Sequence, residues 1–99
     1  MKALIIKPEN KVIEEIEITD QSDIVALVGF ETIISDEVNE AGDKLFFDEE
    51  CFIRGNNGRF KLDNLIPVSG IGIVVGTSGD DLTDKSISID ELKSRVKYL

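Results

Sequence analysis

The sequence has 99 residues, with 20 acidic side chains against 11 basic ones, no histidine and a net charge of -9. This length fits one small domain, residues 1–99, and no apolar run approaches the ~20 residues that a membrane span needs. The negative charge argues against direct binding of nucleic acid, because phosphate contacts require a basic surface. A single cysteine, Cys51, allows no internal disulfide and predicts a cytoplasmic location.

The first third of the chain predicts a β-hairpin followed by a helix. Residues 3–6 are an apolar run closed by Pro8, which is typical of a buried strand ending in a turn. Residues 12–18 roughly alternate, although Ile13 breaks the pattern, and predict a half-buried strand. Three side chains of this strand are expected to face the core: Val12, Ile16 and Ile18.

A short helix is predicted next, because Thr19 and Asp20 are good N-cap residues and Gly29 is a typical helix end. Its apolar residues at helical spacing are Ile24, Leu27 and Val28. Strands are then predicted over residues 30–35 and 44–47, with a polar turn at residues 39–43 between them.

The middle of the chain predicts a second hairpin. Residues 51–53 and 59–62 flank the sequence Gly55-Asn56-Asn57-Gly58, whose residue types tolerate the positive φ of tight turns. Residues 68–75 predict one strand, in which Gly70 and Gly72 mark a bulge or a close backbone approach. Residues 76–81 predict a loop.

The C-terminus predicts an amphipathic helix, in which Ser88 and Glu91 form a capping box. Its expected apolar stripe consists of Ile89, Leu92, Val96 and Leu99. The whole pattern predicts an α+β domain. We expect an antiparallel sheet of five to six strands, one short internal helix and this C-terminal helix.

Catalytic motifs are weak. Without histidine the usual Ser–His and Cys–His nucleophiles are excluded, and Cys51 beside Phe52 is expected to be a packed apolar residue. The glycines from Gly70 to Gly76 fail the dinucleotide fingerprint, since Val75 stands where a glycine is needed. Asp80, Asp81 and Asp84 do not have the spacing of a calcium loop. We therefore predict no catalytic residue, no metal and no cofactor.

Charge is distributed unevenly along the chain. No basic residue occurs between Lys11 and Lys44, and ten carboxylates lie there. Such a segment predicts an acidic face that meets a basic protein surface. Its candidate partner-binding residues are Glu14, Glu17, Asp36 and Glu37. The alternative interpretation is that the surplus acids only keep the protein soluble.

Basic residues gather around the second predicted hairpin. Turn amides and cationic side chains there could hold a small anion or nucleotide. The candidate anion-binding residues are Arg54, Asn56, Asn57, Arg59 and Lys61. The alternative is that the cations pair with acids across the sheet, namely Asp48, Glu49 and Glu50.

Several stretches of the chain resemble a known family of small proteins. They are Ile5-Ile6-Lys7-Pro8, residues 28–33, residues 46–50, residues 69–76 and the closing helix from Ser88. In these stretches the chain resembles the family called domain of unknown function 3846, which occurs in bacteriophages, plasmids and Gram-positive bacteria. That resemblance implies a small cytosolic accessory protein of a mobile element, and it assigns no activity to any residue.

We therefore expect a non-enzymatic acidic binding protein that occupies a basic surface of a host or phage macromolecule. A binder of small anions at residues 54–61 is the alternative function. Self-association also stays open, because the edge strands of a small sheet can pair across a two-fold axis.

Overall fold

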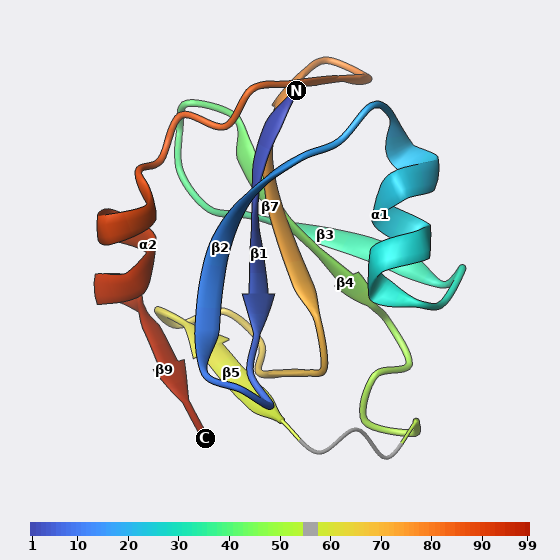
Figure 1. Ribbon diagram of the computed structural model, residues 1–99, viewed down its shortest axis with the longest axis vertical. Helices are drawn as coiled ribbons and strands as arrows, with labels where there is room; N and C mark the ends of the chain where they lie inside the picture. The colour runs from blue at the N-terminus through green and yellow to red at the C-terminus, as the bar shows by residue number, and fades with distance from the viewer. Residues whose placement is uncertain (55–57) are drawn as a thin grey trace.

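One antiparallel sheet is the framework of the protein (Figure 1). The computed structural model describes residues 1–54 and 58–99. Within them the main sheet has the strand order β2-β1-β7-β4-β3, and β8 pairs with β7. The strands are β1 Lys2–Lys7, β2 Val12–Glu17, β3 Ile33–Glu37, β4 Asp43–Asp48, β7 Gly72–Ser78 and β8 Asp81–Thr83. The predicted α+β class, with an antiparallel sheet of five to six strands, is confirmed.

A second, smaller sheet was not predicted. It has the order β6-β5-β9, with bounds Val68–Ser69 for β6, Arg59–Leu62 for β5 and Val96–Tyr98 for β9. Its inward side chains, such as Phe60 and Leu62, are fully buried in a cluster shared with one face of the main sheet. The main sheet is therefore covered on this face by β5, β6 and β9 together with the C-terminal helix.

Both faces of the main sheet are buried, which explains the continuous apolar run at residues 3–6. Leu4 and Ile6 belong to the cluster with the small sheet, whereas Ala3 and Ile5 belong to a second cluster on the opposite face. Helix α1, Gln21–Val28, contributes its two buried side chains, Ile24 and Val28, to the second cluster. The three layers are thus α1, the main sheet, and the small sheet with α2.

The predicted signals of α1 act as expected. The Asp20 side chain accepts a hydrogen bond from the backbone N–H of Ser22, and Gly29 ends the helix at a φ of 93°. The N–H of Gly29 donates to the carbonyl oxygen of Val25. Leu27, in contrast, is 40% exposed and not part of the core.

The inward residues of β2 differ from the prediction. Ile13 is buried and lies opposite Ile6, whereas Val12 is 37% exposed. The reason is that β2 lies against a sheet with two buried faces, so its odd and even positions both meet apolar neighbours. Ile13 packs in the cluster with the small sheet, and Ile16 packs on the face with α1.

The C-terminal helix is shorter than predicted. Helix α2 covers Ile89–Arg95, and the Ser88 hydroxyl caps it by accepting from the N–H of Glu91 at 3.1 Å. Val96 begins strand β9 instead of continuing the helical stripe, and Leu99 is 62% exposed. Pairing with β5 overrides the helical pattern here, because Val96 and Tyr98 pack against the core as alternate residues of a strand.

The predicted hairpin around residues 55–57 is wrong in its first strand. Residues 51–54 form a turn, in which the N–H of Cys51 donates to the carbonyl of Asp48. Strand β5 pairs with β6 and β9 instead. The turn residues Asn56 and Asn57 lie outside the described part of the chain.

Further boundaries differ by a few residues. β3 begins at Ile33 rather than Phe30, and the predicted loop at residues 76–81 contains the end of β7 and the start of β8. The predicted strand over residues 68–75 divides at Gly70, whose φ is 93°, into β6 and β7 of different sheets. Gly72 marks the expected close approach, since a Cβ there would lie 2.7 Å from the Phe60 ring.

Candidate functional site

The four predicted partner-binding acids lie at opposite edges of the main sheet. Glu14 and Glu17 are on β2, and Asp36 and Glu37 are on β3, with three strands between them. Asp36 lies opposite Leu45, and its Oδ2 atom is buried. The fold therefore does not gather these four side chains into one surface.

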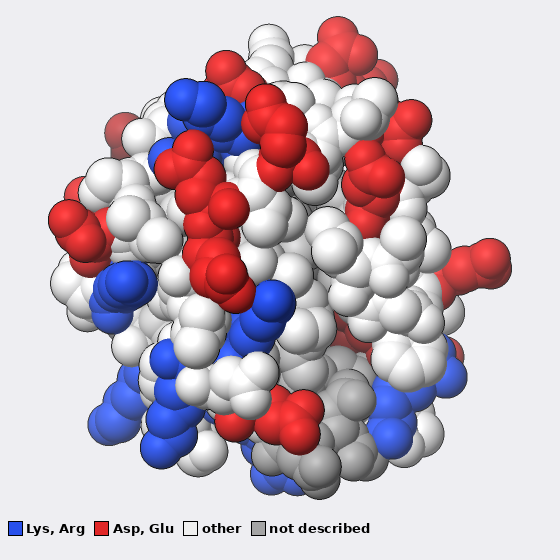
Figure 2. All heavy atoms as spheres, in the orientation of Figure 1, with Lys and Arg blue, Asp and Glu red and all other residues white. Residues whose placement is uncertain are grey.

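Strand β2 carries the densest acidic group, which we call the acidic edge: Glu14, Glu15 and Glu17. All three are exposed on an edge strand, and Figure 2 shows a run of acidic side chains over β2. Glu14 pairs with Lys7 at 3.0 Å, and this is the one ion pair of the acidic edge among the residues described. Most of its negative charge is thus open to a partner.

An acidic recess adjoins the end of β2. Glu17 is the cross-strand partner of Lys2 on β1. Met1, the residue before Lys2, lines a surface depression of about 580 Å³. Three carboxylates also line it: Asp20, Asp80 and Asp81. The N-cap hydrogen bonds from the Ser22 hydroxyl and N–H lower the pKa of Asp20, so this carboxylate stays ionised. The recess extends the acidic edge toward the β7–β8 turn.

Asp43, also within the acidic segment, has a structural role. It is fully buried, and its carboxylate accepts hydrogen bonds from the N–H groups of Ser86 and Ile87 at 2.8 and 2.7 Å. The Asn39 side-chain amide donates to it as well, at 2.9 Å. Asp43 thereby ties the 38–43 turn to the segment before α2.

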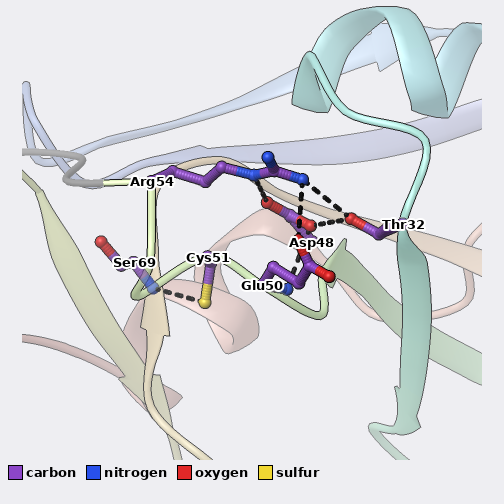
Figure 3. Close-up of polar contacts among 6 residues, drawn as sticks. All are labelled: Thr32, Asp48, Glu50, Cys51, Arg54 and Ser69. Carbon is purple, nitrogen blue, oxygen red and sulfur yellow. Dashed lines mark hydrogen bonds and ion pairs between the residues drawn. The ribbon is translucent and has the colours of Figure 1, made fainter.

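Arg54, the first predicted anion-binding residue, is held by acids of its own chain (Figure 3). Its Nε donates to Asp48 Oδ2 at 3.0 Å, and a terminal nitrogen lies 3.3 Å from Glu50. The guanidinium also lies over the Phe30 ring, 4.1 Å from its centroid. Arg54 therefore pairs with two of the acids named in the alternative interpretation, but it does so within the turn that follows β4 and not across the sheet.

Asp48 is the buried partner in this network. Burial acts to raise its pKa, but hydrogen bonds from Thr32, Arg54 and the Glu50 N–H, together with the Arg54 charge, lower it by more. The net pKa of Asp48 is therefore below its ordinary value of 3.8. An ionised, fully paired carboxylate of this kind stabilises the loop and leaves Arg54 little capacity for a ligand.

Two of the other four candidate anion-binding residues lie in the described structure and two do not. Asn56 and Asn57 lie outside the described residues. Arg59 and Lys61 both lie on β5, with side chains directed away from buried Phe60 and Leu62. Lys97 of β9 lies directly opposite Lys61. The sequence prediction missed Lys97 because it placed that residue in a helix, although the period-two pattern of Val96, Lys97 and Tyr98 is a strand signal.

Cys51 is a packed residue, as expected. Its exposed fraction is 2%, and its sulfur accepts a hydrogen bond from the N–H of Ser69 at 3.4 Å. The nearby guanidinium of Arg54 is engaged by Asp48, so it does not face the thiol as an activating cation (Figure 3).

No metal centre is found within residues 1–54 and 58–99, where no group of three potential ligands comes together. The glycines at positions 70, 72 and 76 belong to a strand break and to β7, and β7 is followed by β8 rather than by a helix. In the same described ranges, neither helix has the length and apolar character required to cross a membrane.

Comparisons with protein-family models, with curated proteins and with solved structures find no match for this chain. The resemblance to domain of unknown function 3846 stays a prediction.

Proposed function

We propose that this is a non-enzymatic binding protein that uses the acidic edge and the adjoining acidic recess to occupy a basic surface of another macromolecule. The observation that carries the proposal is that Glu14, Glu15 and Glu17 are all exposed on one edge strand, and that among the described residues a single one of these carboxylates has an ion pair. We take a host or phage protein as the partner, because the family resemblance implies an accessory protein of a mobile element.

Several features of the site support a macromolecular partner. The edge strand β2 offers backbone groups together with exposed carboxylates on both of its faces, Glu15 and Glu17 on one and Glu14 on the other. The recess beside Met1 gives room for a basic side chain. Exposed acids of one sign attract a basic surface over a distance of about 10 Å at 0.1 M salt. Association should therefore be fast and should weaken as salt increases.

The alternative function, binding of a small anion at residues 54–61, is less well supported. Arg54 is engaged by Asp48 and Glu50, so the anion would depend on Arg59 and Lys61 alone among the described candidates. These two residues belong to a different surface, the outward face of the small sheet.

The structure supplies a matched pair of variants for testing the acidic edge. Glu15→Gln with Glu17→Gln neutralises β2, whereas Glu31→Gln with Glu37→Gln makes the same change in net charge at the opposite side of the sheet. The immobilised proteins are exposed to host lysate at low salt and eluted with a salt gradient. We expect one basic protein to elute from the wild type and the control at similar salt, and at clearly lower salt from the β2 variant.

Equal elution from both variants would contradict the proposal, because it would show that net charge rather than the acidic edge retains the partner. Elution of many basic proteins over a broad range would also contradict it, since that is the behaviour of a nonspecific cation exchanger.

A further inference from the structure

The outward face of the small sheet carries a group of cations that are distant in sequence. Arg59 and Lys61 alternate along β5 with buried residues, and Lys97 alternates in the same way along β9. We call Arg59, Lys61 and Lys97 the basic strip. In Figure 2 basic side chains gather at the lower left, over the position of β5 and β9 in Figure 1.

The register of β5 and β9 makes this strip unusual. Lys61 and Lys97 are direct cross-strand partners, an arrangement in which like charges destabilise a sheet. Beyond the pairing of Leu62 with Val96, Asp63 and Arg95 form an ion pair. Asp63 thus has a partner of opposite charge, whereas Lys61 faces a residue of the same charge, although the chain contains 20 acidic residues.

Neither lysine of the strip has an ion-pair partner among the described residues. Arg59 lies over the Phe52 ring, 5.3 Å from its centroid, and Phe52 is 49% exposed. The N–H of Leu99, the residue that follows β9, donates to the Arg59 carbonyl, and Leu99 is 62% exposed. Arg59, one of the three cations, therefore lies beside two residues whose apolar side chains are exposed.

We propose that the basic strip is a second interaction surface, which binds an acidic segment of a partner protein in extended conformation. Alternate residues of an extended chain repeat at about 6.6–6.8 Å, which is also the repeat of Arg59 and Lys61 along β5. Acidic residues at alternate positions would meet these cations, and neighbouring apolar side chains would contact Phe52 and Leu99. Three cations can neutralise a few carboxylates at close range.

The negative net charge of the chain favours a protein segment rather than nucleic acid as the ligand of the basic strip. Binding to nucleic acid depends on many phosphate contacts, and a chain of net charge -9 repels a long polyanion except at the strip itself. The apolar flanks also fit a segment in which acidic and aliphatic residues alternate. This surface has the opposite sign to the acidic edge, so the two can bind different partners.

The test uses a fluorescein-labelled peptide of alternating glutamate and valine, with fluorescence anisotropy at low salt as the readout. A peptide with glutamine in place of glutamate and an oligothymidine of equal length are the comparison probes. Lys61→Gln with Lys97→Gln removes the lysine pair. Lys2→Gln with Lys93→Gln is the matched control, since it makes the same charge change elsewhere.

We expect the glutamate peptide to bind more tightly than the other two probes. Its affinity should fall about tenfold in the strip variant, as expected for loss of two exposed charge contacts, and should change little in the control. Equal loss in both variants, absence of peptide binding, or tighter binding of the oligothymidine would overturn the proposal. Glu15→Gln with Glu17→Gln should not weaken this binding, so its outcome is separate from that of the acidic edge.

Discussion

Lys61 of β5 and Lys97 of β9 are direct cross-strand partners on the exposed face of the small sheet. Just beyond the ends of both strands, Asp63 and Arg95 form an ion pair instead. The hydrogen bonds and the charge of Asp63 raise the pKa of the Arg95 guanidinium, and partial burial opposes this effect without cancelling it. The charged pair beside the sheet is therefore electrostatically satisfied, whereas the lysine pair within the sheet is not.

Lys97→Glu should stabilise the protein, because it replaces a repulsive row with an attractive one. We expect a gain of about 1 kcal/mol in the free energy of unfolding, or roughly 4–8 °C in Tm. Urea and thermal unfolding measure it. Lys2→Glu is the control of opposite sign, since it places a carboxylate opposite Glu17 and should lower stability. A loss of stability in Lys97→Glu would show that repulsion between Lys61 and Lys97 does not destabilise the sheet.

Asp43→Ala should be among the most destabilising polar substitutions. It leaves the buried N–H of Ile87 and the N–H of Ser86 without their acceptor. We expect a loss of about 3 kcal/mol or more, because each unsatisfied buried group costs about 1–3 kcal/mol. Urea unfolding compares it with exposed Asp80→Ala, for which little change is expected. Similar stability of the two variants would contradict the role given to Asp43.

Asp48 should contribute to the acid sensitivity of the protein. Its pKa is lowered in the folded state, so its stabilising contribution is complete above its unfolded pKa near 3.8 and is lost as pH falls through the lower folded pKa. In Asp48→Asn, unfolding free energy should therefore depend less steeply on pH below about 5. Urea unfolding at a series of pH values measures the slope. Equal slopes for wild type and variant would contradict this assignment.

Gly72→Ala should destabilise the junction between the two sheets. The added Cβ would lie 2.7 Å from Phe60 Cζ and 2.9 Å from Leu45 Cδ1, and both side chains are fully buried. Overpacking of this kind costs about 1–3 kcal/mol. Chemical denaturation measures the effect, and an unchanged midpoint would show that the Phe60 ring can move aside.

Sequence patterns predicted the elements whose signals are local. The cap at Asp20, the end at Gly29 and the cap at Ser88 each depend on residues within one helical turn, and each is present in the structure. Strand pairing over long separations was harder to predict. The partners of β5 are β6 and β9, whose identity depends on packing of Phe60 and Leu62 against the main sheet.

The candidate site shows the same difference between local sequence signals and long-range strand pairing. The acidic character of β2 is visible in the sequence, whereas the separation of β2 from β3 depends on the insertion of three strands between them. Likewise, Lys61 and Lys97 are 36 positions apart and become neighbours only through sheet pairing. Charge along the chain therefore led to the prediction of a binding protein but could not show which charges share a surface.

The acidic edge is tested most directly by mapping its contacts. The basic protein eluted from the immobilised chain is titrated into isotope-labelled protein, and backbone amide chemical shifts are followed. We predict that the largest changes fall on β2 and on the residues of the acidic recess, and that they disappear at high salt. Largest changes on β3 or on the small sheet would contradict the assignment of β2 as the interface.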